Sequence, residues 1–139
     1  MAQYEIPQGL YYTSDHAWVK VEENKIRIGI TDFMQKLAGE ITFIRIPRVG
    51  KTLTAGATLS SIQSGKWAGK IQVPMSGKVL EVNTELPANP KLLNTDSYGA
   101  GWICVMEPDD LAAGLQTLIH GEAADAFFTA EHAKYAKPE

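Results

Sequence analysis

The stretch Ser61-Ile62-Gln63-Ser64-Gly65-Lys66-Trp67-Ala68-Gly69-Lys70-Ile71-Gln72-Val73-Pro74 contains two short runs of alternating apolar and polar residues with a glycine-flanked interruption between them. Alternation with a period of two is typical of a strand that buries one face, and glycine between two such runs is typical of a turn. The stretch therefore predicts a β-hairpin with Lys66 and Trp67 at its turn.

Lys66 at this turn has two explanations that the periodicity leaves open. A solvated lysine is common at turns, because its ammonium group is best placed in water. A primary amine held on a rigid turn, far from the core, is also where a ligase could attach a swinging prosthetic arm. The wider sequence has to decide between them.

Short alternating runs elsewhere predict a mainly β fold. Residues 17–30 alternate on both sides of a turn at 23–24 and predict a second hairpin. Residues 31–39 predict a short capped helix, and residues 41–46 predict a further strand. Glycines then recur between short runs, which favours a small barrel or sandwich, because a parallel sheet would need helical crossovers.

The pattern changes to helix after Pro108. Asp109-Asp110 can cap a helix that ends at Gly121, and a second helix is expected from Glu122 to Tyr135. The residues expected to face the barrel are Leu111, Leu115, Leu118 and Ile119 in the first helix and Ala123, Ala126, Phe127 and Ala130 in the second.

The length and composition predict one domain. A chain of 139 residues with 45% hydrophobic content can bury one core of ordinary size but not two. We expect a single domain over residues 1–139, with its β core at about 10–107 and a C-terminal helical tail at 108–139.

Charge and hydropathy exclude two classes of partner. A formal net charge of −3 without a run of Lys and Arg argues against nucleic-acid binding. No apolar run approaches the roughly 20 residues that a membrane span requires, and the N-terminus does not resemble a signal peptide. The sequence predicts a soluble, cytoplasmic protein.

A catalytic or metal centre is not evident. His16, His120 and His132 share no metal-ligand spacing and are expected to be surface or cap residues. Cys104, the only cysteine, lies in an apolar strand-like run and is expected to be a buried, inert thiol. No nucleophile with a base, phosphate loop or dinucleotide fingerprint occurs, so the sequence predicts a protein that is not an enzyme.

Several further segments together resemble the H protein of the glycine cleavage system. They cover most of residues 10–120 in order and without large gaps. The segments are Tyr12-Thr13-Ser14-Asp15-His16-Ala17-Trp18-Val19, Gly29-Ile30-Thr31-Asp32, Leu37-Ala38-Gly39-Glu40-Ile41, Pro74-Met75-Ser76-Gly77-Lys78-Val79-Leu80-Glu81-Val82-Asn83, Pro90-Lys91-Leu92-Leu93-Asn94 and Tyr98-Gly99-Ala100-Gly101-Trp102-Ile103.

The resemblance implies a lipoyl carrier. Its expected fold is a barrel-sandwich hybrid, the flattened barrel of lipoyl domains, with C-terminal helices added. Lipoic acid would be joined by an amide to Lys66, which lies where the family has its modified lysine. The implied partners are a lipoate ligase or other lipoylating enzyme and the enzymes that load and unload the arm. The arm's dithiolane can open, carry a group on sulfur and close again.

The chain departs from the family pattern around the expected arm and cargo. Gln63 stands where the family has an acid, Ala17 replaces a Glu, Phe33 replaces a His and Lys70 replaces an Asp. The change at Gln63 removes a charge that a lipoylating enzyme could recognise. The other three changes remove groups that could hold a cationic aminomethyl arm, since a buried unpaired charge is costly. Lys70 would suit an anionic cargo, while Phe33 and Trp67 would suit an apolar arm.

These departures lead us to expect an H-like lipoate-binding paralogue of the sulfur-oxidation type. Its arm would carry a sulfur-bound intermediate in a system related to heterodisulfide reductase. The alternative is an H protein that carries the aminomethyl group from glycine decarboxylase to aminomethyltransferase. A domain that has kept the fold without the cofactor is also possible, whereas biotin carriage is disfavoured because its Met-Lys-Met context is absent.

Overall fold

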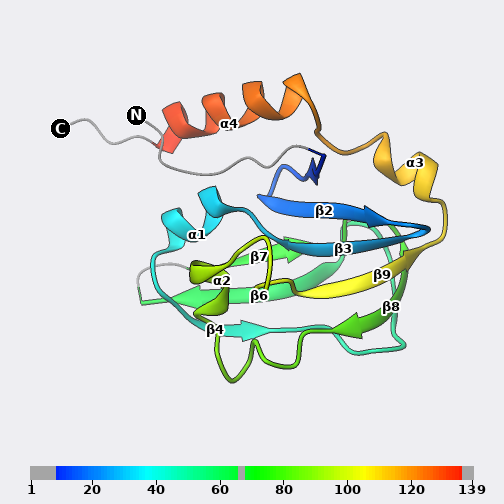
Figure 1. The fold of residues 1–139 in the computed structure, drawn as a ribbon, viewed down its shortest axis with the longest axis horizontal. Coiled ribbons are helices and arrows are strands. Elements are labelled where there is room, and N and C mark those ends of the chain that lie inside the picture. Colours follow the sequence, from blue (N-terminus) through cyan, green and yellow to red (C-terminus); the bar gives the residue numbers. More distant parts are fainter. Residues whose placement is uncertain (1–8, 66–67, 136–139) are drawn as a thin grey trace.

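The structure is a computed structural model that describes residues 9–65 and 68–135. In this part of the chain the strands form a six-stranded antiparallel sheet, in the order β1-β2-β3-β9-β8-β5, and a three-stranded antiparallel sheet, in the order β4-β6-β7 (Figure 1). The strands are β1 (Tyr11–Tyr12), β2 (Ala17–Glu22), β3 (Lys25–Ile30), β4 (Ile41–Arg45), β5 (Thr52–Leu53), β6 (Thr58–Ser64), β7 (Ala68–Gln72), β8 (Gly77–Val82) and β9 (Cys104–Pro108). The predicted mainly β architecture is confirmed.

The helices are short and flank the sheets. They are α1 (Asp32–Ala38), α2 (Leu92–Thr95), α3 (Leu111–Leu115) and α4 (Glu122–Tyr135). Thr31 caps α1 by accepting a hydrogen bond from the Met34 amide, and Gly39 ends it with a φ of 78°, a conformation that costs glycine little. The first hairpin and α1 lie where the sequence predicts them.

The main hydrophobic core is built from the inward faces of both sheets and from α1. Isoleucine and valine dominate, as expected for strands that bury one face. Fully buried members include Ile26, Ile28 and Ile30 from β3, Ile62 from β6 and Ile71 from β7. Cys104 of β9 belongs to the same core, which confirms that its thiol is buried.

The helical tail differs from the sequence prediction. The first helix, α3, ends at Leu115 instead of Gly121. Ile119, which was expected on the helix, pairs with Tyr12 through two backbone hydrogen bonds of 2.7 and 2.8 Å. The chain leaves the helix because an edge strand, β1, offers these backbone groups partners there.

Helix α4 has the predicted bounds, but three of the four residues predicted to pack inward do not, and only Phe127 packs as predicted. Ala124 and Phe128 are the buried positions, Phe127 is half-buried, and Ala123, Ala126 and Ala130 are exposed. Alanine occurs on both the buried and the exposed sides of this helix, so its sequence carries little periodic signal and Phe128 decides which face turns inward. Figure 1 shows α4 lying along the side of the molecule formed by β1 and β2.

Candidate functional site

The hairpin that carries the predicted lysine is formed by β6 and β7. These strands pair antiparallel, and Gln63 lies opposite Ala68 in the register. Lys66 and Trp67 fall between the two strands in the sequence, and both lie outside the described residues. The described residues of β6 and β7 therefore show how the backbone on each side of Lys66 is held.

The turn end of the hairpin is hydrogen-bonded to the C-terminal end of α1. The Ser64 hydroxyl, two residues before Lys66, donates a hydrogen bond of 2.6 Å to the Ala38 carbonyl oxygen. Ile41, at the start of β4, pairs with Ser64 in the sheet. The backbone next to the expected attachment point is thus anchored to both a helix and a neighbouring strand.

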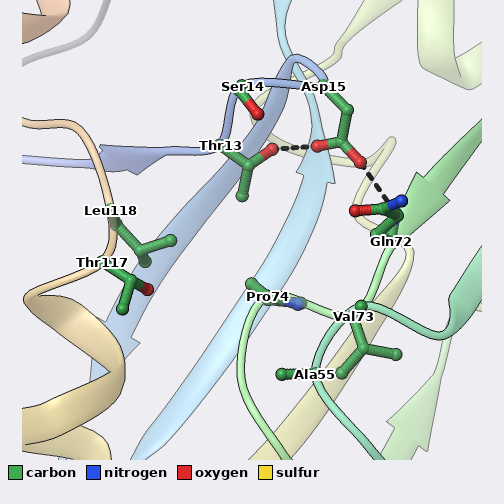
Figure 2. A pocket seen from close by; sticks show the side chains of 10 residues that line it. Thr13, Ser14, Asp15, Ala55, Gln72, Val73, Pro74, Thr117 and Leu118 are labelled. Atoms are coloured by element: carbon green, nitrogen blue, oxygen red, sulfur yellow. Dashed lines mark hydrogen bonds between the residues drawn. The ribbon is translucent and has the colours of Figure 1, made fainter.

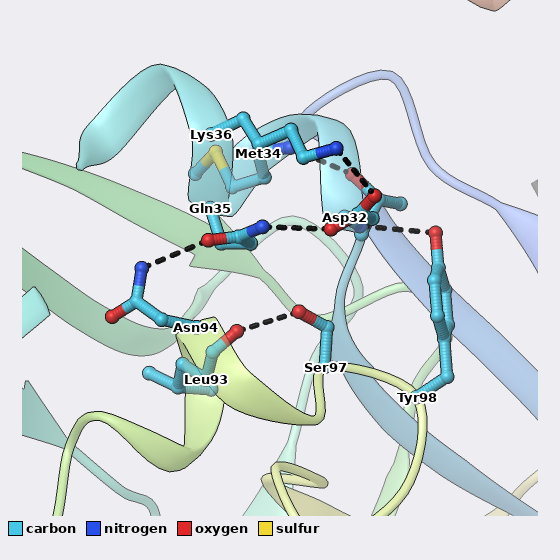
Figure 3. A network of polar contacts seen from close by, with 9 residues as sticks. Asp32, Met34, Gln35, Lys36, Leu93, Asn94, Ser97 and Tyr98 are labelled. Atoms are coloured by element: carbon cyan, nitrogen blue, oxygen red, sulfur yellow. Dashed lines mark hydrogen bonds and ion pairs between the residues drawn. The ribbon is translucent and has the colours of Figure 1, made fainter. Parts of the chain in front are cut away.

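Asn94 of α2 completes this anchor. Its side-chain nitrogen donates to the Gly39 carbonyl oxygen at 2.8 Å and to Gln35 Oε1 at 2.9 Å, while its Oδ1 accepts from the Ile41 amide at 2.9 Å. Figure 3 shows Asn94 pointing at Gln35, which in turn bonds Asp32. One asparagine therefore provides hydrogen-bond partners for the backbone groups between α1 and β4. No local sequence pattern predicts this role.

Gln63 and Lys70 lie beside the hairpin turn on the outer face of the three-stranded sheet. Both side chains are exposed. The register places Arg45, Ser61 and Lys70 in one row across β4, β6 and β7. Two of the five residues expected around the arm are thus brought together on the surface next to the hairpin.

Ala17 and Phe33 lie elsewhere. Ala17 is fully buried in the main core, and Phe33 is only 4% exposed. Phe33 stacks on the His16 ring with centroids 4.9 Å apart and lies 5.9 Å from the Phe128 ring of α4. In the described structure neither side chain lines a surface next to the hairpin.

The aromatic cluster that contains Phe33 consists of Tyr12, His16, Trp18, Phe33, Phe127 and Phe128. It joins the start of β2 and α1 to the inner side of α4. Phe128 meets the Tyr12 ring edge-on at 5.1 Å. Such ring pairs add stability beyond the apolar area that they bury, so the cluster is what holds α4 on the β domain.

His16 is not a surface or cap residue, which corrects that prediction for this position. It is buried, and its Nε2 lies 2.8 Å from a carboxylate oxygen of Glu131 on α4. Its backbone φ of 70° lies in the left-handed region. By contrast, His120 is exposed beside the Tyr11 ring, and His132 has no described side chain. The burial of His16 depends on α4, which follows it by more than 100 residues.

A small cavity of about 220 Å³ lies where β7 ends, at the end of the β6–β7 hairpin opposite the turn. Asp15 accepts a hydrogen bond from the Gln72 amide at 2.8 Å and another from the Thr13 hydroxyl (Figure 2). Asp15 is the only ionisable residue among those that line the cavity. Its carboxylate is used to hold the turn before β2 against β7, so this cavity has no pair of groups for acid–base chemistry.

The described residues contain no other catalytic arrangement. Burial raises the pKa of the Cys104 thiol to about 12, which keeps it protonated and unreactive. Within residues 9–65 and 68–135 no group of three His, Cys, Asp or Glu side chains could hold a metal ion. In the same part of the chain no helix is both long and apolar enough to cross a membrane.

The sequence profile of the family described as glycine cleavage H-protein matches residues 10–131. This chain belongs to the glycine cleavage H-protein family. A relative from Coprothermobacter proteolyticus, named glycine cleavage system H protein, is 44% identical over 124 residues, covering 88% of this chain and 97% of the relative. A relative from Pyrococcus horikoshii, named probable glycine cleavage system H protein, is 39% identical over 123 residues, covering 88% and 91%.

A solved structure shows the same fold. The glycine cleavage system H protein from Mycobacterium marinum superposes with a TM-score of 0.79 at 30% identity, covering 91% of this chain and 98% of the other. The predicted family and the predicted lipoyl-domain-like fold with C-terminal helices are confirmed. The relatives' names do not support the sulfur-oxidation reading and agree better with the glycine cleavage alternative.

Proposed function

We propose that this protein is the lipoyl carrier of a glycine cleavage system, with lipoic acid attached to Lys66. The observation that supports this most is family membership over residues 10–131, together with relatives of 39–46% identity that are named glycine cleavage system H protein. The arm would carry the aminomethyl group from glycine decarboxylase to aminomethyltransferase. Those enzymes and a lipoylating enzyme are the proposed partners, in the cytoplasm.

The hairpin fits a covalently attached arm. Ser64 bonds the end of α1, Asn94 fixes the backbone that follows α1, and the side chains of Gln63 and Lys70 are exposed. A carrier needs an attachment point whose orientation is fixed while the arm itself moves. The hydrogen bonds beside the hairpin turn fix that orientation. When attached, the lipoyl group supplies a dithiolane that is opened reductively and carries the cargo on sulfur.

The carrier acts without a catalytic centre of its own. The chemistry of loading and unloading belongs to the partner enzymes, and this chain's residues position the arm and present a docking surface.

A sulfur-bound cargo is the second candidate, because of Lys70. Its exposed ammonium lies in the same cross-strand row as Arg45, and none of the described acidic side chains forms an ion pair with it. A cation beside the arm would favour an anionic cargo over the cationic aminomethyl group. The names of the relatives do not support this candidate, so it is retained only as the outcome that would replace the first.

The attachment site is tested first. The intact mass of protein treated with lipoate ligase, ATP and lipoate should rise by one lipoyl group, and Lys66→Arg should abolish the increase. Lys70→Arg is the matched control and should remain fully lipoylated. Lipoylation of the Lys66→Arg variant, or none of the wild type, would show that the attachment point or the carrier role is wrong.

The cargo is tested with the lipoylated protein. Incubation with glycine, glycine decarboxylase and pyridoxal phosphate should load an aminomethyl group, visible by mass and released by aminomethyltransferase with tetrahydrofolate. At saturating carrier concentration, Lys70→Asp should speed loading, since it restores an acid beside the arm. Complete failure of a fully lipoylated wild type to load would remove the aminomethyl proposal in favour of the sulfur-bound cargo.

A further inference from the structure

The charges of this chain are divided unevenly along the sequence. Residues 41–80 contain six of the thirteen Lys and Arg residues and none of the sixteen Asp and Glu residues. This stretch carries a formal charge of +6, whereas the rest of the chain carries −9. Amide formation at Lys66 would reduce the stretch to +5. The mild net charge of the whole protein therefore conceals a cationic segment that includes the hairpin.

The tertiary structure gathers much of this positive charge on one side. All three strands of the smaller sheet, β4, β6 and β7, come from residues 41–80. Its outer face presents Arg45 and Lys70 in one cross-strand row, and both side chains are exposed. No carboxylate can alternate with these cations within the sheet, because its strands contain none.

A groove extends the cationic face beyond β4. It has a volume of about 640 Å³ and contains Arg45, Arg48 and Lys51, with hydroxyl and apolar side chains between them. The remaining lining residues are Ile46, Pro47, Leu53, Thr58, Leu59, Ser60 and Ser61. None of the described acidic side chains forms an ion pair with Arg45, Arg48 or Lys51.

Exposed apolar side chains flank the groove. Phe43 is 48% exposed on the same face of β4 as Arg45, and Val49 is 60% exposed in the loop that holds Arg48. Among the described residues these are the large hydrophobic side chains classed as exposed. Arginine and an exposed aromatic side chain are residue types that are enriched in protein–protein interfaces.

We propose that this cationic face, formed by Phe43, Arg45, Arg48, Val49, Lys51 and Lys70, docks an acidic and partly apolar surface of a partner protein. The inference rests on the proposed function, under which the partner is the glycine decarboxylase that loads the arm. Four cations spread over a sheet and a loop match the acidic surface of a protein, and Phe43 provides an apolar anchor for it.

The face is close enough to the hairpin to guide the arm. Ser61 lines the groove, and Ser64 lies at the turn end of the hairpin. They are three residues apart in β6, which corresponds to about 10 Å along a strand. A partner held on the cationic face would therefore lie within reach of a lipoyl arm. Docking by charge also allows fast association and release, which a carrier that visits several enzymes needs.

The experiment measures glycine decarboxylase kinetics with fully lipoylated carrier as the varied substrate. Arg45→Gln/Arg48→Gln/Lys51→Gln should raise the apparent KM for the carrier about tenfold at low ionic strength and leave kcat nearly unchanged. Raising the salt concentration should raise the wild-type KM toward that of the variant, because exposed charges are screened. Phe43→Ser should also raise KM, but this part of the effect should not depend on salt.

The matched control removes three cations outside the face. Lys20→Gln/Lys25→Gln/Lys36→Gln changes three exposed lysines that lie outside residues 41–80, so it alters the net charge equally. It should leave the KM for the carrier unchanged. Thermal unfolding and intact mass should confirm that each variant is folded and lipoylated before kinetics are compared.

The outcomes separate the docking surface from the proposed function. Wild-type loading with equal KM values for the face and control variants would overturn the docking surface and leave the carrier function standing. No loading of the lipoylated wild type would overturn the aminomethyl cargo and this partner together. Saturable binding of inorganic phosphate by the free carrier, lost in the face variant while its KM is unchanged, would assign the groove to a small anion instead.

Discussion

Two sides of this molecule use similar residue types in opposite ways. On the side covered by α4, the aromatic cluster is closed: Phe33 and Phe128 are 4% and 0% exposed, and His16 is paired with Glu131. On the cationic face, Phe43 is 48% exposed, and the cations have no ion pair with any described acid. One side is covered by the chain's own helix, whereas the other is left open beside the hairpin.

The difference indicates how a small carrier divides its surface. The side under α4 contributes stability through buried rings, whose removal from water is favourable at roughly 25 cal/mol per Å². The cationic face lacks that contribution, because Phe43 and Val49 are exposed to water. The four predictions below test this division from the largest expected effect to the smallest.

Phe128→Ala should destabilise the protein by about 3–5 kcal/mol, because it leaves a cavity among packed rings. The matched change Phe43→Ala on the cationic face should alter the free energy of unfolding by less than about 0.5 kcal/mol, as for other surface substitutions. Urea unfolding of both variants measures the difference. Similar losses at both positions would mean that the two sides are not divided as described.

Gly29→Ala should cost about 1–3 kcal/mol, the usual penalty for overpacking. Gly29 lies opposite Trp18 in the β2–β3 register, and an added Cβ would fall 2.5 Å from the buried indole ring. Gly65→Ala, beside the hairpin turn, is the control, since a Cβ there meets none of the described atoms within 4 Å. A larger loss of stability in the control would contradict the prediction.

Asn94→Ala should cost about 1–3 kcal/mol, because the buried Ile41 amide and the Gly39 carbonyl group lose their half-buried partner. Hydrogen exchange should speed up at the amides of Ile41 and of Ser64, beside the hairpin turn, while the amides of β3 keep their protection. Thr95→Ala, which removes an exposed hydroxyl from the same helix, is the control. Unchanged exchange at Ile41 in the Asn94 variant would disconnect Asn94 from the anchoring of the hairpin.

Cys104→Ala tests the effect that is smallest at neutral pH, because it develops only at alkaline pH. The folded pKa of about 12 lies above the unfolded one of about 8.5. The thiol's contribution to stability is therefore complete below pH 8.5 and is lost as pH rises toward 12. The variant should lose less stability than wild type between pH 9 and 11, and native Cys104 should resist iodoacetamide at pH 8 until urea is added. Rapid labelling without urea would contradict its burial.

The sequence predicts local elements well where the relevant forces are local. The β2–β3 hairpin and the Thr31 cap with Gly39 depend on neighbours within a few residues, and all were predicted correctly. The buried face of α4 was not predicted correctly, because its alanines lie on both the buried and the exposed sides. Only packing against Tyr12 and Phe33 selects Phe128 as the buried residue. The helix after Asp110 was predicted too long, because its end depends on the distant strand β1.

Taken alone, the sequence determined the family, the mainly β architecture and the position of Lys66 between two strands that pair. These follow from period-two alternation, turn residues and motifs, all of which are written along the chain. Only the tertiary structure decided that His16 and Phe33 are buried under α4, that Asn94 fixes the backbone beside the hairpin turn, and that Arg45, Arg48 and Lys51 line one groove. Burial and charge proximity depend on segments far apart in sequence, so they exist only once the chain has folded.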